Sequence, residues 1–158
     1  MIRAQPITAT AFAPFGEVIE SGCAASILIN DGKCQRFTDL ITLDIVDGAV
    51  GLSLFDAQLR DIPYACTLLE RHPLGSQCFI PMQNSTYLVI VAPDADGVPG
   101  APLAFLAGAG QCVNIARNTW HGVLCPVAGS GLFAVIDRIG EGPNLQEFTL
   151  ADPLIVAL

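Results

Sequence analysis

The sequence predicts an all-β fold, either a barrel or a sandwich of short strands. Short apolar stretches recur along the chain, and turns rich in Gly and Pro separate them. Two of these stretches are joined by Asp47-Gly48, a dipeptide that favours a hairpin turn. The ranges expected to form strands are 27–29, 40–46, 50–55, 64–72, 77–81, 86–92, 103–107, 111–115, 123–124 and 132–138.

We expect one domain over residues 1–158, because the chain shows neither an internal repeat nor a linker. Ahead of the barrel, Thr8 is a predicted N-cap for a short helix that runs through Phe12 and ends at Pro14 and Gly16. Residues 21–40 read as a loop that contains the short strand at 27–29. The continuously apolar stretch 86–92 predicts a strand that is buried on both faces.

The composition indicates an apolar surface that needs covering. Hydrophobic residues make up 52% of the chain and charged residues only 14%, whereas large apolar patches are uncommon on monomers. We therefore expect a homodimer, the commonest closed assembly. The apolar C-terminal segment 153–158 should pack across that interface or against its own barrel. A formal net charge of -8 argues against nucleic acid and against a membrane as partners.

The cysteine pattern favours a reducing compartment. No pair has a CxxC or zinc-ribbon spacing, and the first residues contain no apolar core of a secretory signal. No long unbroken apolar run predicts a membrane span. We expect a cytoplasmic protein whose cysteines act as small apolar core residues. These are Cys23, Cys34, Cys66, Cys78, Cys112 and Cys125.

Glu70 and His72 are the strongest candidates for a functional site. Side chains of a strand alternate between its faces, so these two residues point to the same side. Gln77 follows on the next expected strand, and His121, the only other histidine, can join from a later strand. An acid, an amide and two imidazoles would then meet inside a small barrel. The alternative is that each histidine is structural and bonds a backbone carbonyl.

Four arginines are candidates for holding an anionic group, because the planar guanidinium donates two parallel hydrogen bonds to a carboxylate. They are Arg36, Arg71, Arg117 and Arg138, among only seven basic residues. Arg71 is out of phase with Glu70 and His72, so we expect it on the outer face, toward a loop or a second subunit. The alternative for each is a surface arginine paired with an acid, and the sequence does not choose among them.

These residues resemble the two motifs of cupin barrels. The first cupin motif has two histidines one residue apart and then a Glu, and a second motif adds one more His. Here Glu70 replaces the first of those histidines, Gln77 replaces the Glu, and His121 stands at the second motif. The run 70–82, together with 117–121, is similar to the ureidoglycolate lyase family of allantoin breakdown. Further matches lie at 15–20, 29–32 and 136–138.

The resemblance implies a cupin-type barrel, a double-stranded β-helix or jelly roll, that cleaves (S)-ureidoglycolate to glyoxylate and urea. It implies catalytic roles for Glu70, His72, Gln77 and His121, and adds Asn30 to the four arginines as a substrate-binding candidate. It also associates a divalent metal with the same catalytic residues, nickel first, with zinc or manganese as alternatives. Two other functions stay open: a metal-dependent cupin isomerase or dioxygenase, and a cupin that binds a small ligand without catalysis.

Overall fold

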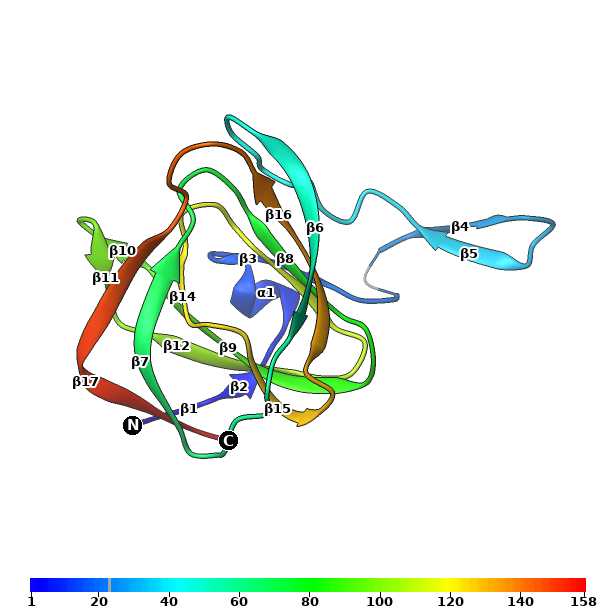
Figure 1. Cartoon of the computed structure of the whole chain (residues 1–158). Helices are drawn as coiled ribbons and strands as arrows, with labels where there is room; N and C mark the ends of the chain where they lie inside the picture. Colours follow the sequence, from blue (N-terminus) through cyan, green and yellow to red (C-terminus); the bar gives the residue numbers. More distant parts are fainter. Residues whose placement is uncertain (23) are drawn as a thin grey trace.

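The computed structural model describes residues 1–22 and 24–158 and shows a nearly closed β-barrel (Figure 1). The all-β barrel predicted from the sequence is confirmed. Among the described residues the one helix is α1 (Ala9–Phe12). The Thr8 side chain accepts a hydrogen bond from the Ala11 N–H at 3.2 Å, so it caps this helix as predicted.

Two sheets form the wall of the barrel. The larger is eight-stranded, and β15 (Cys125–Gly129) joins it by pairing with β9. Its other strands, in order across the sheet, are β1 (Ile2–Arg3), β17 (Gln146–Ala157), β7 (Tyr64–Arg71), β14 (Trp120–His121), β9 (Ser85–Ala92), β12 (Leu103–Ala107) and β2 (Gln5–Pro6). The five-stranded sheet runs in the order β3 (Gly16–Ile19), β13 (Cys112–Ile115), β8 (Gln77–Pro81), β16 (Leu132–Ile139) and β6 (Ala49–Asp56).

The central strand β9 contributes to both hydrophobic cores. Tyr87, Val89 and Val91 belong to the core inside the barrel, which also contains Phe79 and Val113 of the other sheet. Alternate residues of β9 pack instead into a second core on the outer side of the large sheet. The prediction that this strand is buried on both faces is therefore confirmed, and it explains the unbroken apolar run at 88–92.

Three expectations for the strands were wrong. Residues 40–46 form no strand, so Asp47-Gly48 does not join a hairpin; the segment makes a single bridge, from Ile45 to Gly75, and β6 pairs with β16 instead. The strand expected at 123–124 begins at Cys125. The sequence analysis also missed β17, which contains Pro153. This strand contains an irregularity between Thr149 and Leu154, where a Pro is tolerated.

The C-terminal segment is packed against its own barrel, one of the two arrangements expected for it. It pairs with β7 on one side and with β1 on the other, and Val156 is fully buried. Cysteines divide between core and surface. Cys66, Cys78 and Cys125 are buried, as expected, but Cys34 is exposed, and Cys23 lies outside the described residues.

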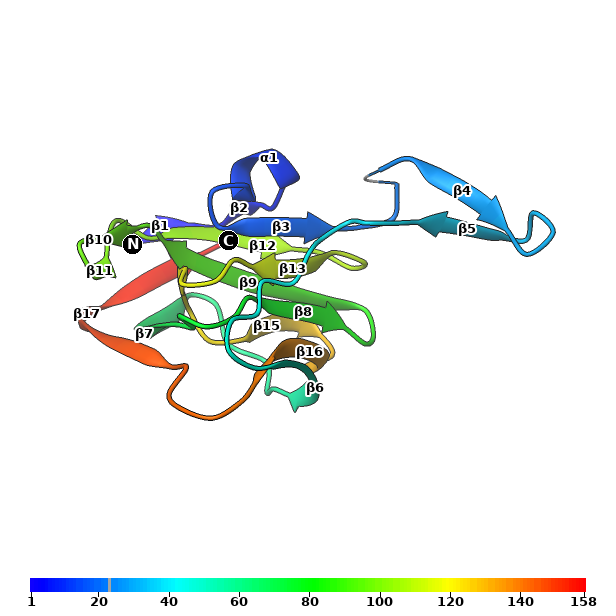
Figure 2. The same ribbon diagram turned by 90° about the horizontal axis from the view of Figure 1, so that it is seen from above.

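A two-stranded hairpin extends away from the barrel (Figures 1 and 2). It consists of β4 (Ser26–Ile29) and β5 (Cys34–Phe37), and we call residues 26–37 the arm. The sequence analysis expected a loop here with one strand. Asn30, Asp31 and Gly32 have left-handed φ values of 53°, 57° and 76°, which allow a tight turn at its tip. A second, smaller hairpin pairs β10 (Asp94–Ala95) with β11 (Val98–Pro99).

No helix in the described part of the chain combines the length and the apolar character needed to cross a membrane.

Candidate active site

The large sheet brings Glu70 and His121 together at the inner face of the barrel. His121 of β14 lies directly opposite Glu70 of β7 on one side and Val91 of β9 on the other. Paired residues share a face of a sheet. Val91 belongs to the core inside the barrel, so the side chains of Glu70 and His121 also face inward.

His72 completes a cluster of three, which we call the triad. It follows β7 directly, its Nε2 lies 3.9 Å from Oε1 of Glu70, and its ring centroid lies 5.2 Å from that of His121. One ligand atom from each of the three residues lies within 4.8 Å of the other two. The predicted shared face of Glu70 and His72 is therefore confirmed, and His121 joins them as expected.

Backbone carbonyls fix the tautomers of both histidines. Nδ1 of His72 lies 2.8 Å from the Asn144 carbonyl, and Nδ1 of His121 lies 3.0 Å from the Gly122 carbonyl. A carbonyl oxygen only accepts, so each Nδ1 donates, and each neutral ring keeps a lone pair on Nε2. Both Nε2 atoms are buried, with no hydrogen-bond partner among the described residues. A purely structural role therefore accounts for the Nδ1 atom of each histidine. It leaves the Nε2 atom of each available to bind a ligand or accept a proton.

Burial changes the proton affinity of two triad members. His121 is fully buried, and desolvation of its charged form lowers its pKa from 6.5 to about 4, although the Gly122 carbonyl opposes this. Desolvation also raises the pKa of Glu70, while His72 opposes the rise and Glu147 adds to it. His121 is therefore a neutral imidazole at pH 7, and Glu70 takes up a proton more readily than an ordinary glutamate.

Gln77 lies on the inner face of the other sheet. It pairs with Ile115, a residue of the core inside the barrel, and its Nε2 donates a hydrogen bond to Oδ2 of Asp137 at 3.3 Å. This bond turns the amide so that Oε1 stays buried without a partner among the described residues. A carbonyl-type oxygen is thereby directed into the barrel, where a ligand or a water molecule would use it.

Arg71 lies on the outer face, as its phase predicted. Its Nη1 is 2.7 Å from Oδ1 of Asp94, its Nε donates to Gln146, and the guanidinium lies 4.4 Å from the centroid of the Trp120 ring. All of these contacts are on the side of the sheet away from the triad.

Arg138 has a structural environment. It is buried, and its guanidinium donates to the carbonyls of Val46, Asp47 and Glu141, thereby joining two loops. Arg117 is different, because its side chain is 40% exposed. It donates to the Pro73 carbonyl at 3.1 Å and to Oδ2 of Asp44 at 2.8 Å.

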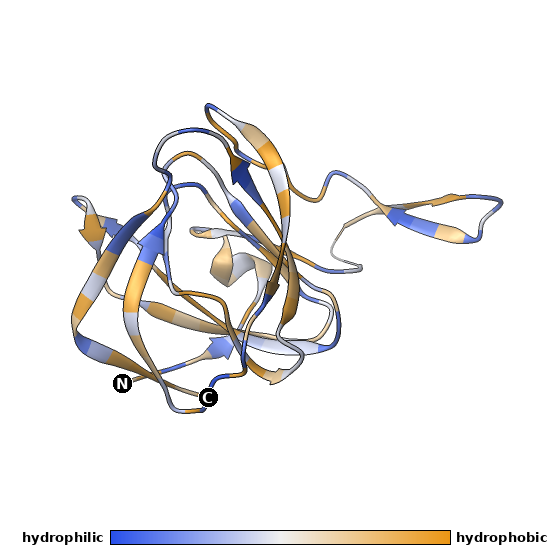
Figure 3. Cartoon of the chain, viewed as in Figure 1, coloured by the Kyte–Doolittle hydropathy of each residue, from blue (hydrophilic) through white to orange (hydrophobic). Residues whose placement is uncertain are grey.

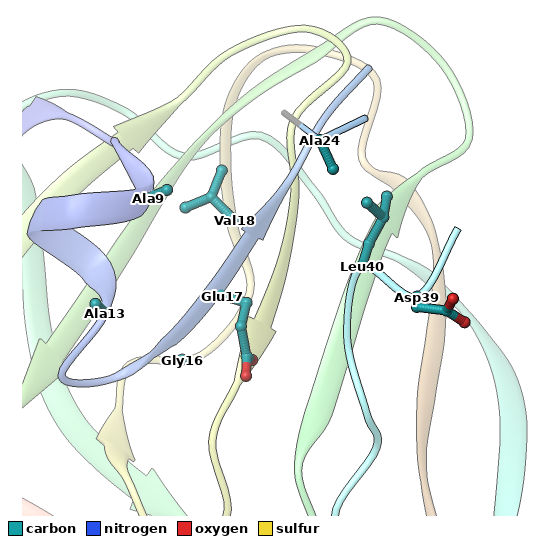
Figure 4. A pocket seen from close by; sticks show the side chains of 8 residues that line it. All are labelled: Ala9, Ala13, Gly16, Glu17, Val18, Ala24, Asp39 and Leu40. Carbon is teal, nitrogen blue, oxygen red and sulfur yellow. The ribbon is translucent and has the colours of Figure 1, made fainter. Parts of the chain in front are cut away.

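Asn30 and Arg36 are on the arm, and they do not join the triad. Asn30 begins the turn at the tip, and Arg36 is an exposed residue of β5. A cavity of about 380 Å³ lies where the arm leaves the barrel, between α1, β3 and both ends of the arm (Figure 4). Glu17 and Asp39 are its acidic lining residues, and none of the triad lines it. It is separate from the candidate active site.

Three further residues act on the site, and the sequence analysis did not select them. Asn144 accepts from His72 with its carbonyl and holds the Leu74 N–H with its side chain at 2.7 Å. Asp137 orients Gln77, and Glu147 lies opposite Glu70 across β17 and β7. The only signal in the sequence was the position of Asp137 within a segment that matches the family. The other two reach the site through β17 and the loop before it, which the analysis did not recognise.

The donor set of the triad fits a divalent transition metal. Two neutral imidazole nitrogens and one carboxylate are a ligand set that nickel, zinc and iron accept. The backbone carbonyls behind both histidines are the outer contacts that metal-binding histidines usually have. The two unpartnered Nε2 atoms are the observation that supports this fit.

Comparison with known proteins assigns the chain to a family. The family described as ureidoglycolate lyase matches residues 1–157. A ureidoglycolate lyase of Rhodobacter capsulatus is 54% identical over 153 residues, which cover 96% of this chain and 95% of that protein. One from a Chelativorans species is 48% identical, covering 99% and 96% of the two chains. Ureidoglycolate lyase 2 of Rhizobium meliloti is 47% identical, covering 94% and 93%. This chain belongs to the ureidoglycolate lyase family.

Proposed function

We propose that this protein cleaves (S)-ureidoglycolate to glyoxylate and urea. The family supports the reaction, and the observation that carries the assignment to a site is the triad. Its two Nε2 lone pairs and its carboxylate lie within 4.8 Å of one another at the inner face of the barrel. Such a group can accept and return a proton next to a small polar substrate.

The reaction needs one proton to move. The carbon at which the C–N bond breaks carries a carboxylate, a hydroxyl and the urea nitrogen. When the hydroxyl loses its proton, its oxygen forms the C=O bond of glyoxylate as the C–N bond breaks. The departing urea nitrogen takes up a proton, so no proton is gained or lost overall. A base and an acid on the same side of the substrate, or one group serving as both, satisfy this requirement.

His72, not His121, is the histidine to which we assign the role of base. Burial lowers the pKa of His121 to about 4, which makes its Nε2 a weak proton acceptor. His72 is partly exposed and is 3.9 Å from Glu70, whose pKa is raised. We assign to His72 the removal of the hydroxyl proton and to Glu70 its delivery to the urea nitrogen. His121 and the amide oxygen of Gln77 orient the substrate.

A divalent metal, nickel by family resemblance or else zinc or manganese, would be held by Glu70, His72 and His121, with Gln77 as a weaker ligand. When bound, such an ion would polarise the hydroxyl and lower its pKa. One Nε2 lone pair cannot hold an ion and accept a proton at the same time. The metal-free and metal-bound assignments of His72 therefore exclude each other, and activity with and without metal decides between them.

Arg117 is the arginine that we assign to the substrate carboxylate. Of the four candidates it is the one whose guanidinium contacts the residue after His72, the carbonyl of Pro73, and its side chain is 40% exposed. Its ion pair with Asp44 is at the surface, where such pairs contribute little. A substrate carboxylate can therefore replace Asp44. We further propose that the enzyme works in the cytoplasm as a homodimer.

The test is release of glyoxylate from purified ureidoglycolate. The protein is assayed as isolated, after chelation, and after addition of Ni²⁺, Zn²⁺ or Mn²⁺, with both enantiomers as substrate. We expect equimolar glyoxylate and urea from the (S) form without consumption of oxygen. Ammonia in place of urea, consumption of oxygen, or binding without turnover would each reject the proposed reaction.

A further inference from the structure

The arm is a hairpin that needs a covering partner. It lies beyond the barrel in two views at right angles (Figures 1 and 2). Leu28 of β4 is 69% exposed, and Ile27 beside it is also exposed. An isolated two-stranded hairpin is marginally stable in water at best, and exposed strand edges invite pairing. The arm therefore gains stability if its apolar side chains are covered.

A matching apolar surface lies on β6. Val50, Leu52 and Leu54 alternate along this strand and share its outer face, because Leu52 and Leu54 lie opposite Ile136 and Ala134 of β16. Leu52 is 70% exposed and Leu54 66% exposed. We call these three residues the ridge. The ribbon of β6 has hydrophobic segments along its length (Figure 3).

The ridge lies on the last strand of the five-stranded sheet, and the arm follows the strand at its opposite edge. The sheet order places β3 at one edge and β6 at the other, and the arm begins shortly after β3. Figure 2 shows the arm beyond the β3 edge and β6 on the far side of the sheet. An arm therefore extends away from the ridge of its own chain.

The charges of the two surfaces are complementary. The arm has two basic residues, Lys33 and Arg36, and one acidic residue, Asp31, in a chain whose net charge is -8. Both basic residues are exposed. Asp47 and Asp56, which flank β6 at its two ends, are exposed as well. A second copy of this chain therefore offers the arm an apolar strip between two carboxylates.

We propose that two copies of this chain exchange their arms, each arm covering the ridge of the other copy. One contact then covers the exposed ridge and one apolar face of the arm. The two contacts are equivalent by a two-fold axis, which closes the assembly as a dimer. The apolar side chains supply the binding free energy, and the charges set the orientation of the arm. The proposal names the surfaces of the dimer and does not depend on which reaction the triad catalyses.

The first test compares matched variants by sedimentation equilibrium. The arm variant is Ile27→Asp with Leu28→Asp, and the ridge variant is Leu52→Asp with Leu54→Asp. Each should weaken the dimer by about 100-fold or more, because the dimer has two equivalent contacts and each loses the burial of at least one apolar side chain. Val98→Asp is the control, since it changes an exposed apolar residue on the other hairpin. Circular dichroism must show that all three variants remain folded.

The second test mixes the two weakened variants. If arm meets ridge, the ridge variant still has a native arm and the arm variant still has a native ridge, so the mixture restores one of the two contacts. We expect heterodimers at a concentration where each variant alone is a monomer. A monomeric wild-type protein, a dimer that survives either variant, or a mixture that stays monomeric would each overturn the proposal. Glyoxylate release is measured in parallel, so failure of the interface is distinguished from failure of the proposed reaction.

Discussion

Glu70 and Arg71 are neighbours in the sequence, and they have opposite surroundings. Glu70 faces into the barrel and lies beside two imidazoles, and burial raises its pKa. Arg71 faces outward, stacks on Trp120 and pairs with Asp94 at the surface. The alternation of a strand separates them by the thickness of the sheet. Proximity in a motif therefore does not make two residues parts of one site.

The inner face should determine turnover. Replacing Glu70 or His72 with Ala is expected to lower kcat by about 100-fold or more, the usual loss for a missing acid–base group, while Arg71→Ala serves as the control on the outer face. Glyoxylate release measures the rate, and circular dichroism checks the fold. Activity within a few-fold of wild type in both inner-face variants would remove the triad from the mechanism.

Burial of His121 should make the chelated protein lose stability in acid. Its folded pKa of about 4 lies below the unfolded value of 6.5, so its contribution is present above pH 6.5 and is lost as the pH falls toward 4. The loss should be roughly 3 kcal/mol, from 1.36 kcal/mol per pKa unit. Urea unfolding of wild type and His121→Gln between those values measures it. The raised pKa of Glu70 makes the free energy of unfolding change with pH in the opposite direction. Wild type and His121→Gln both contain Glu70, so the comparison between them isolates His121. Parallel profiles for the two proteins would contradict the assignment.

Replacing Arg138 tests whether this buried arginine stabilises the fold or binds the substrate. Arg138→Met should lower the free energy of unfolding by about 2 kcal/mol, since it leaves carbonyls of two loops without their donor. Arg60→Met, at an exposed arginine, should change it by less than about 0.5 kcal/mol. Thermal and urea unfolding provide the values. If Arg138→Met instead raised KM with stability unchanged, Arg138 would replace Arg117 as the carboxylate-binding residue.

The outer face of β7 should show the smallest effect. Arg71→Leu removes the stacking on Trp120, which contributes about 1 kcal/mol, so the melting temperature should fall slightly. kcat and KM should stay within a few-fold of wild type. A large rise in KM would mean that Arg71 reaches the substrate, and the two faces of β7 would then not be separate in function.

The arginines show where sequence reasoning reached its limit. The four candidates are chemically equivalent, and the phase of a strand could be applied only to Arg71. What separates the others is their contacts: Arg138 donates to carbonyls of two loops, Arg117 donates to the Pro73 carbonyl next to His72, and Arg36 is on the arm. Those contacts come from loops far apart in the chain, which no local pattern describes. The prediction of a strand at 40–46 was wrong for a related reason. An apolar segment that packs against a sheet without pairing has the same composition as a strand, so its local pattern does not distinguish the two.

By itself the sequence determined the local features of this protein: the strands β7, β8 and β9, the cap of α1, and the shared face of Glu70 and His72. These depend on alternation, propensity and turn chemistry, which act over a few residues. Only the tertiary structure placed His121 opposite Glu70, turned both Nε2 atoms inward, and brought Asn144 and Glu147 to the site. Those arrangements depend on the pairing of strands that are far apart in the chain, and that pairing is decided by the burial of a common core.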